Sequence, residues 1–370
     1  MIHATPHAVS LKADWIHGWS AAAGLRDDWR ALHRAPDTFG AHLFNDFAFL
    51  DIWQSHFGAG KDLVVLSVRE ADGRLSGLAP LQIETSVRGP VSLRRLGFMH
   101  NGFISRVSAL MRGDVAAIAR AMADALAAHA SSFDDMVCDQ MLAECPAQIA
   151  LRAALADAGF LTFETPGDRA LRLVDFAGTE DDFVQKSPKA NRQNFNRAIR
   201  RCKALPDFKV TVTTDATRSR NLHRRLFSLD WLSGKSDRPG AIYPIEGKQF
   251  HTELGEQAER VGGVEFVEAW SEGKLVASIV SIVNRRIKYL YVTYYDDAFR
   301  EQSPGLLVVL RAIGTGLEDP DIDLVDLNGD SELLRRISNA RIDRVLFKAN
   351  HRRGRSFAIG LARKAKRRIT

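Results

Sequence analysis

The residues best suited to binding an anion lie at 302–307, between a predicted strand at 288–295 and a predicted helix. Ser303 is a typical N-cap residue, and Pro304 fits the first helical position, where an N–H group is not needed. Gly305 keeps side-chain bulk away from the first-turn N–H groups, which carry about half a positive charge from the helix dipole. This arrangement suits a pyrophosphate. An ordinary capped helix would have the same residues, so both interpretations stay open.

Residues that could act as acids or bases are scattered along the same half of the chain. His251 has a pKa suited to proton transfer, although a single histidine on a predicted helix is more often structural. Glu265 and Glu268 are three apart on one predicted strand and should point to opposite faces, as should Tyr291 and Tyr294 on the next strand. The spacing indicates no Ser-His-Asp or Cys-His group and no metal-ligand cluster, so we expect no bound metal.

An internal repeat organises the elements that must position these residues. A strand, a turn at Gly73 and a second strand span 62–81, and the same pattern recurs around Gly273 over 264–281. Each copy continues into further strand, a helix and a short apolar strand; the helices are predicted at 116–129 and 306–317, and the last strands at 133–138 and 322–327. A repeat of this length predicts two domains of one α+β fold, each with a mixed sheet flanked by helices.

The turn-forming cluster at 165–168 predicts the boundary between the two domains. Before it, 147–158 is predicted as a helix that ends at Gly159. After it, 171–176 alternates like a strand, and Thr179 can cap a helix. We therefore expect an N-terminal domain at 1–167, a C-terminal domain at 168–354 and a basic amphipathic tail at 355–370.

The order of these elements resembles the GNAT acyltransferase fold, in which a [Gln/Arg]-x-x-Gly-x-[Gly/Ala] loop binds the pyrophosphate of acyl-CoA. Gln302 and Gly305 match that loop, and Leu307 departs from it because a small residue is usual there. The chain is more similar to the cellulose-biosynthesis-type, Fem-like branch with tandem GNAT domains. The matching motifs are Tyr295-Asp296, Ser303-Pro304-Gly305, Ser187-Pro188-Lys189-Ala190-Asn191-Arg192 and Asp326-Leu327-Asn328-Gly329-Asp330. Leu333 and Leu334 replace a Tyr-Lys pair of that branch, which indicates either an apolar substrate channel or helix packing.

The resemblance implies one acyl-CoA site, in the second domain. Its residues would be Thr293, Gln302, Ser303, Pro304, Gly305, Leu306 and Leu307. The first domain has no Ser-Pro-Gly loop at the equivalent 100–103, so we expect it to be a degenerate copy. Acyl transfer to an amine needs a base for the amine, a donor for the developing oxyanion and a proton for the leaving thiolate. The candidates for these roles are Glu268, Tyr294, Asp326 and His251.

Composition narrows the class of protein. The chain has 370 residues, 45% of them hydrophobic and 26% charged, which is typical of globular domains. No apolar run approaches the ~20 residues of a membrane-spanning helix, and the first residues lack a signal-peptide pattern. The three cysteines, Cys138, Cys145 and Cys202, form no Cys-x-x-Cys spacing, which favours a reducing compartment. We expect a cytoplasmic protein.

Positive charge is concentrated in two segments. Residues 186–203 contain seven Lys and Arg and no acid, and residues 335–370 contain thirteen Lys and Arg and one acid. In the tail, Phe357, Leu361, Ala365 and Ile369 recur at a spacing of four, which predicts an amphipathic helix of the type that lies on anionic membranes. A solubilising tail is an alternative. RNA binding is a third, although few aromatic residues accompany the cations.

These features predict an N-acyltransferase that moves an acyl group from acyl-CoA, or from an acyl carrier protein, to a primary amine. The branch resemblance implies an amino sugar or polysaccharide precursor as acceptor. The apolar Leu333 and Leu334 and the basic tail favour a long-chain, sphingoid-type amine at the inner membrane, as in GNAT-like bacterial ceramide synthases. Fem-type transfer from aminoacyl-tRNA through the 186–203 segment, and a non-catalytic scaffold, are the alternatives.

Overall fold

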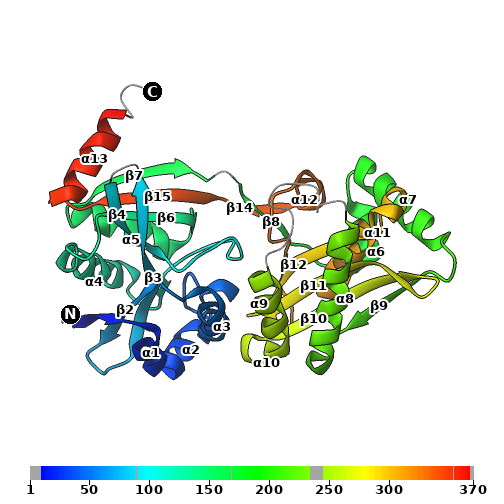
Figure 1. Cartoon of the computed structure of the whole chain (residues 1–370), viewed down its shortest axis with the longest axis horizontal. Helices are drawn as coiled ribbons and strands as arrows, with labels where there is room; N and C mark the ends of the chain where they lie inside the picture. Colours follow the sequence, from blue (N-terminus) through cyan, green and yellow to red (C-terminus); the bar gives the residue numbers. More distant parts are fainter. Residues whose placement is uncertain (1–9, 89–90, 168, 234–244, 353, 367–370) are drawn as a thin grey trace, which may run out of the picture. The chain divides into compact units, whose positions relative to one another are not determined.

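The computed structural model describes residues 10–88, 91–167, 169–233, 245–352 and 354–366, and these form two compact units (Figure 1). The second unit is Arg169–Ile342, and the chain returns to the first unit at Asp343. No helix within these described ranges is long and apolar enough to cross a membrane. The predictions for the first residues of the chain and for Ile369 lie outside the described residues.

The first unit is built on an eight-stranded sheet in the order β1-β2-β3-β4-β6-β15-β7, with β5 paired to β3. The predicted hairpin at 62–81 is confirmed as β2 and β3, with Gly73 at a φ of 86° in the turn. Its strands are β1 (Leu11–His17), β2 (Asp62–Glu70), β3 (Leu75–Arg88), β4 (Val91–Phe98), β5 (Leu110–Met111), β6 (Asp135–Leu142), β7 (Leu161–Pro166) and β15 (Arg344–Asn350). Its helices are α1 (Trp19–Ala22), η1 (Ala23–Leu25), α2 (Arg26–Arg34), η2 (Leu43–Asn45), α3 (Phe47–Phe57), α4 (Val115–Ala128), α5 (Pro146–Asp157) and α13 (Gly354–Lys366).

The second unit is built on a seven-stranded sheet in the order β14-β8-β13-β12-β11-β10-β9. The predicted hairpin at 264–281 is confirmed as β10 and β11, and both turn residues, Glu272 and Gly273, have positive φ. The strands are β8 (Leu171–Val174), β9 (Lys209–Thr213), β10 (Gly263–Ser271), β11 (Lys274–Asn284), β12 (Ile287–Tyr295), β13 (Leu324–Asp326) and β14 (Ala340–Ile342). The helices are α6 (Glu180–Lys186), α7 (Lys189–Lys203), η3 (Ala216–Arg218), α8 (Ser219–Leu232), α9 (Ile245–Glu256), α10 (Ala258–Val261), η4 (Asp297–Gln302), α11 (Pro304–Leu317) and α12 (Glu332–Ile337).

Helices cover both faces of the second sheet. On one face α6, α7 and α11 close a core that includes Phe195, Leu290 and Val309. On the other face α8 and α10 close a second core around Phe266 and Tyr294. Thr179 caps α6 as predicted, because its hydroxyl accepts the N–H of residue 182 in a capping box. The mixed α+β fold with two helix-flanked sheets is therefore confirmed.

One strand corrects the predicted domain limits. The strand predicted near 345–347 exists as β15, but it lies between β6 and β7 and is antiparallel to both. Residues 343–366 therefore belong to the first unit, whereas we expected 168–354 to form one domain and 355–370 a separate tail. The second sheet has a matching feature, since β8, from the start of that unit, lies between β13 and β14 from its end. Local sequence predicts a strand but not its distant partner, which explains the difference.

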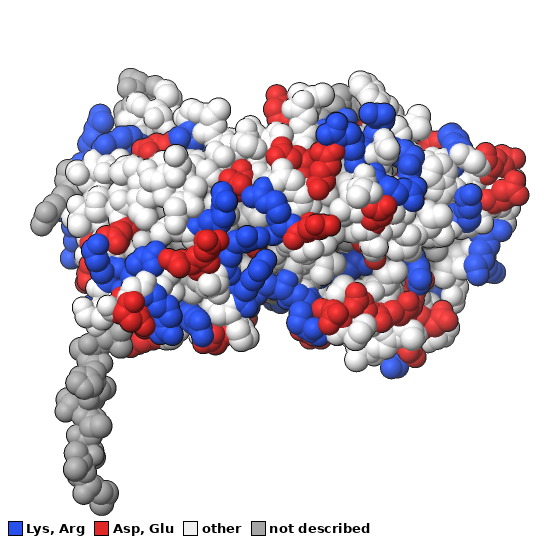
Figure 2. Space-filling view, turned by 90° about the horizontal axis from the view of Figure 1, so that it is seen from below, with Lys and Arg blue, Asp and Glu red and all other residues white. Residues whose placement is uncertain are grey.

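Charge is mixed on one face of the described surface. On the face seen in Figure 2, Lys and Arg side chains are interspersed with Asp and Glu. The net charge of +6 is therefore not displayed as one continuous basic surface on that face.

Candidate active site

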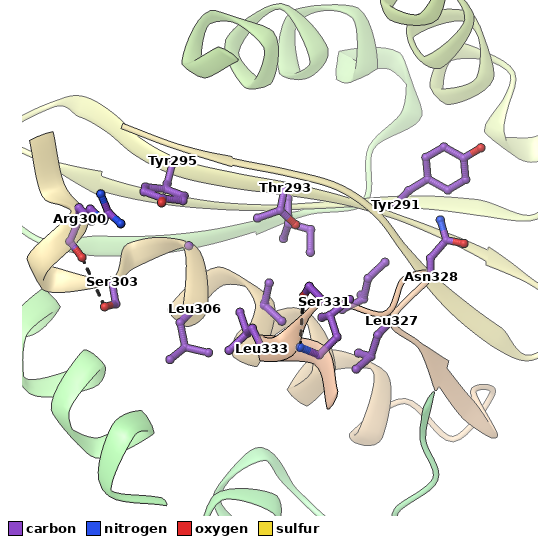
Figure 3. A pocket seen from close by; sticks show the side chains of 15 residues that line it. Tyr291, Thr293, Tyr295, Arg300, Ser303, Leu306, Leu327, Asn328, Ser331 and Leu333 are labelled. Carbon is purple, nitrogen blue, oxygen red and sulfur yellow. Dashed lines mark hydrogen bonds between the residues drawn. The ribbon is translucent and has the colours of Figure 1, made fainter. Parts of the chain in front are cut away.

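A cavity opens where two parallel strands of the second sheet separate. β12 pairs with β13 at Ile287, Lys288 and Tyr289, and then continues to Tyr295 along β11. Within the described residues, no strand pairs with that edge of β12 beyond Tyr289. Backbone N–H and C=O groups at a free strand edge are available to hydrogen-bond an extended ligand. The cavity beside this edge has a volume of about 600 Å³ (Figure 3).

An irregularity in β12 lies inside this cavity. The register against β11 shifts between Val280 and Ser281, which leaves Tyr291 as an extra residue between Leu290 and Val292. Such a bulge locally turns the backbone and re-aims side chains. Tyr291 and Tyr294 consequently pack on the same face of the sheet, against the α8 core, and the prediction that they face opposite sides is wrong.

The lining of the cavity divides into a polar end and an apolar body. In Figure 3, Arg300, Ser303 and Tyr295 gather at one end, and Tyr291 and Asn328 lie at the other. The body between them is mostly aliphatic, from Ile279, Leu290, Leu306, Val309, Leu327, Leu333 and Leu334. Leu333 and Leu334, the pair that departs from the resembled branch, therefore contribute to the cavity wall.

The polar end is the start of α11, as the loop motif predicted. Ser303 occupies the N-cap position in a left-handed conformation, with φ 59° and ψ 47°, and its side chain does not cap the helix. The hydroxyl instead donates to the carbonyl of Arg300 at 3.5 Å, while the N–H groups of Leu306 and Leu307 share the Ser303 carbonyl at 3.1 and 3.3 Å. The positive end of the helix dipole is thus not covered by a side-chain oxygen, which favours an anion there.

Gly305 is required by close packing. A Cβ atom at this position would lie 2.9 Å from Cδ1 of Tyr295, and the glycine therefore lets the aromatic ring lie against the helix start. Arg300 is exposed and lines the same end of the cavity, so it adds a full positive charge to that of the dipole. Arg300 was not among the residues predicted from the sequence. The available signal was a basic residue in the turn immediately before the loop at 302–307.

The predicted acyl-CoA residues occupy two kinds of position. Thr293, Ser303, Gly305 and Leu306 line the cavity, whereas Gln302, Pro304 and Leu307 are not among its lining residues. Pro304 and Leu307 are buried, so the bulk of Leu307 is directed into the protein. The backbone carbonyl of Gln302 accepts the thiol proton of Cys202 on α7, at 3.2 Å, and its Oε1 is buried without a hydrogen-bond partner.

None of the four predicted acid–base residues is among the residues that line the cavity. Glu268 is buried and accepts two hydrogen bonds from Arg225, at 2.9 and 2.7 Å. Asp326 is fully buried, accepts the N–H of Asn328 at 2.7 Å and immediately precedes the lining residue Leu327. Tyr294 is buried, and desolvation together with Asp230 raises its pKa.

His251 stands behind the cavity wall. Its ring meets the ring of Tyr291 edge-on, with centroids 4.6 Å apart. Burial, with a smaller contribution from His223, holds the pKa of His251 well below its usual value, so this imidazole is neutral. Burial also raises the pKa of the Tyr291 hydroxyl, which keeps it protonated at the end of the cavity opposite Ser303.

Glu265 takes part in a separate buried network. It accepts a hydrogen bond from Nζ of Lys288 at 2.5 Å and another from Oγ1 of Thr315 on α11 at 3.0 Å. Glu265 and Glu268 thus face opposite sides of β10, as predicted, and each carboxylate is paired. The described lining contains no Asp, Glu or His.

A second, smaller cavity of about 180 Å³ adjoins the first through shared lining residues: Ser303, Leu306 and Leu333. Its other wall is α7, which contributes Arg197 and Arg201, and Arg336 comes from α12. Arg201 also donates to the carbonyl of Glu301 at 2.7 Å, which ties the basic helix to the loop before α11. The polar end of the main cavity therefore lies next to a cluster of arginines.

In the first unit, the position that corresponds to the cavity is occupied by protein backbone. The segment that follows β4 adds along β6, where the N–H of Val107 donates to the carbonyl of Gln140 at 3.0 Å. The start of the equivalent helix, α4, is capped by the carboxylate of Asp114, which accepts the N–H of Ala117 at 3.0 Å. A carboxylate at this point repels a phosphate. The expectation of a single site, in the second unit, stays a prediction.

Comparison with known proteins identifies this domain. Residues 189–333 match the family model described as acetyltransferase (GNAT) domain. No curated protein matches the sequence. Residues 189–333 are therefore similar to a GNAT acetyltransferase domain, and this match supports an acyltransferase.

Solved structures share the fold of the whole chain at low sequence identity. A conserved protein of unknown function from Bacteroides thetaiotaomicron has a TM-score of 0.55 at 12% identity, covering 88% of this chain and 96% of that one. FemX has a TM-score of 0.55 at 11% identity, covering 89% and 96%. The C-terminal domain of a proposed lysylphosphatidylglycerol synthetase from Agrobacterium fabrum has a TM-score of 0.52 at 12% identity, covering 92% and 95%. These likenesses establish the fold, and the resemblance to the cellulose-biosynthesis-type branch stays a prediction.

Proposed function

We propose that the protein transfers an aliphatic acyl group from acyl-CoA to a primary amine. The observation that carries this proposal is the division of the main cavity. An uncapped helix start and Arg300 form one end, and the body is lined by leucine, isoleucine and valine. A thioester of coenzyme A would match these two regions, because it carries anionic phosphates at one end and an apolar acyl chain at the other.

The phosphates of the donor would bind at the start of α11, where no side chain caps the backbone N–H groups. The arginines of the adjoining cavity, Arg197, Arg201 and Arg336, would neutralise the remaining phosphate charge. The pantetheine arm would follow the free edge of β12 past Thr293 and form β-like hydrogen bonds with its backbone. The thioester would then lie near the bulge at Tyr291.

The reaction needs no change of oxidation state. The amine nitrogen forms a bond to the thioester carbon, and the carbonyl oxygen gains negative charge that backbone N–H groups at the free strand edge can accept. The C–S bond then breaks, and one proton moves from the amine nitrogen to the thiolate. Tyr291 is the protonated group best placed to donate a hydrogen bond to that sulfur, and the neutral His251 holds its ring. Asp326 and water are the candidates for relaying the amine proton.

The size and lining of the cavity support an apolar substrate. A volume of about 600 Å³ holds roughly twenty groups the size of a water molecule, enough for a pantetheine arm and part of an acyl chain. Leu333 and Leu334 line the cavity where the resembled branch has a polar pair, which supports a long-chain amine, or a long acyl chain, over an amino sugar. An acyl carrier protein as donor would use the same arm but would not need the arginine-lined cavity.

A second candidate function is Fem-type transfer from an aminoacyl-tRNA. The observation that favours it is the basic face of α7 next to the mouth of the cavity. It is the weaker candidate because the cavity body offers aliphatic side chains and lacks an acidic group for an amino-acid ammonium.

The test is a panel of CoA thioesters from acetyl to palmitoyl with soluble and long-chain primary amines. Release of free CoA would be measured with a thiol reagent, and the amide product by mass spectrometry. We expect amide formation, with faster turnover of medium- or long-chain donors than of acetyl-CoA. Absence of turnover and of any thermal stabilisation by every thioester would contradict the proposal.

A further inference from the structure

The C-terminal helix α13 is attached to the first unit through one face only. Ser356 is 4% exposed, and Gly360 is buried against β7 and β15. A Cβ atom on Gly360 would lie 2.9 Å from Cδ1 of Leu161 and 3.0 Å from Cβ of Asn350, so the helix backbone packs closely on the sheet. This contact fixes which side of α13 faces the protein.

An ion pair fixes the rotation of the helix as well. Arg363 donates to both oxygens of Asp135, from Nη1 to Oδ1 at 2.6 Å and from Nη2 to Oδ2 at 2.7 Å. Asp135 is fully buried in β6, and Asn350 donates to the same carboxylate at 3.3 Å. A bidentate arginine–carboxylate pair has a strict geometry. Arg363 is therefore engaged within the protein, although the sequence pattern alone counted it among the cations available to a partner.

The opposite face of α13 carries an exposed apolar pair. Phe357 and Leu361, one turn apart, are 37% and 46% exposed. Ala358 and Ala362 are exposed beside them, and Arg355 and Lys364 are exposed near the two ends of the same surface. The sequence of α13 contains no acid. We call these six residues the α13 outer face.

We propose that the α13 outer face docks the first unit onto an anionic lipid surface. Phe357 and Leu361 would enter the boundary between headgroups and acyl chains, while Arg355 and Lys364 would stay with the lipid phosphates. An interfacial helix has this division between apolar and basic positions. Because α13 is already packed on the first unit, the described helix does not have to become ordered on binding. In the sequence, Lys366 ends α13, and two more cations, Arg367 and Arg368, follow it.

Lipid is favoured over RNA by the residue types on this face. Single-stranded RNA is held by flat side chains on which bases stack, and Phe357 is the single aromatic residue on the α13 outer face. Leucine and alanine offer no such platform but partition into a bilayer surface. The proposal is independent of the acyl donor, because it concerns the first unit and the cavity lies in the second.

The experiment is sedimentation of the full-length protein with vesicles. Phosphatidylcholine vesicles with increasing phosphatidylglycerol content would be compared at low and high salt, using the wild type and a Phe357→Ser/Leu361→Ser variant. Ile149→Ser is the matched control, because Ile149 is 49% exposed on another helix of the same unit, α5. We expect wild-type binding to rise with phosphatidylglycerol and fall with salt. The double variant should lose roughly tenfold or more in partitioning, with the control unchanged.

Circular dichroism and thermal unfolding would establish that both variants are folded, and release of CoA with a soluble amine would establish that the transferase site is intact. Failure of the wild type to bind anionic vesicles at low salt would overturn the proposal, as would equal binding by the double variant. Binding of a labelled RNA oligonucleotide that is lost in the double variant, without vesicle binding, would assign this face to RNA instead. None of these outcomes changes the CoA assay, so the two proposals fail separately.

Discussion

Replacement of Gly305 by glutamate is the most direct test of the donor site. The side chain would start 2.9 Å from the ring of Tyr295 and place a carboxylate at the helix start, where the diphosphate of CoA is expected. At about 5 Å and an effective dielectric constant of about 20, one pair of like charges repels by about 3 kcal/mol. A loss of that size weakens binding by roughly a hundredfold.

The assay is thermal unfolding with and without CoA. A ligand at a hundred times its Kd stabilises the folded state by about 2.7 kcal/mol, and at one times its Kd by about 0.4 kcal/mol. The stabilisation seen in the wild type should therefore nearly vanish in Gly305→Glu at the same CoA concentration. The fold should persist without ligand, because an acidic side chain in the first turn of a helix is favourable by about 0.3–1 kcal/mol and offsets the contact with Tyr295.

Gly305→Gln is the matched control, since glutamine has the size of glutamate without its charge. We expect it to keep a measurable part of the CoA-dependent shift. Equal losses in both variants would refute the electrostatic reasoning and indicate a purely steric effect. If CoA stabilised Gly305→Glu as much as the wild type, the proposal that CoA binds at the start of α11 would be wrong.

Three further predictions concern specificity, acid stability and cofactor needs. In the Leu333→Ser/Leu334→Ser variant, kcat/KM for long-chain thioesters should fall roughly tenfold or more, while that for acetyl-CoA stays within about twofold; parallel losses across all chain lengths would place these leucines outside the apolar substrate path. Burial lowers the folded-state pKa of His223 to about 4, below its unfolded value of about 6.5. The unfolded chain then binds protons first as pH falls, so the free energy of unfolding should decline from about pH 6.5 toward pH 4. Urea titrations should give a slope smaller by up to about 1.4 kcal/mol per pH unit in His223→Gln, and an identical slope would contradict this assignment. Turnover of a CoA thioester should survive ribonuclease and chelator treatment; loss after ribonuclease would favour the aminoacyl-tRNA function, and loss after chelation a metal-dependent enzyme.

Features encoded by neighbouring residues were predictable. The two hairpins follow from turn glycines and flanking strand residues, and the start of α11 follows from Ser303, Pro304 and Gly305. The same loop contains three of the residues that line the cavity, Ser303, Gly305 and Leu306. Each of these predictions depends on at most a few consecutive residues.

Features that depend on distant partners were not predictable. The strand at 344–350 was expected, but its place between β6 and β7 depends on residues far away in the sequence. Glu268 looked available for catalysis until Arg225 on α8 was found to pair with it. The bulge at Tyr291 leaves no signal in a pattern of alternating residues, and it reversed the predicted face of one tyrosine.

The insertion of β15 between β6 and β7 has a consequence for biosynthesis. β7 is the edge strand of its sheet and pairs with β15 alone among the described strands, so the first sheet cannot be completed until residues 344–350 leave the ribosome. The second unit is synthesised entirely within that interval and can complete its own sheet first. A premature stop shortly before residue 344 would leave two exposed strand edges in an otherwise synthesised protein, which is a recognised route to aggregation. Pairing of β6 and β7 in the first sheet thus depends on a strand that is made after the whole second unit.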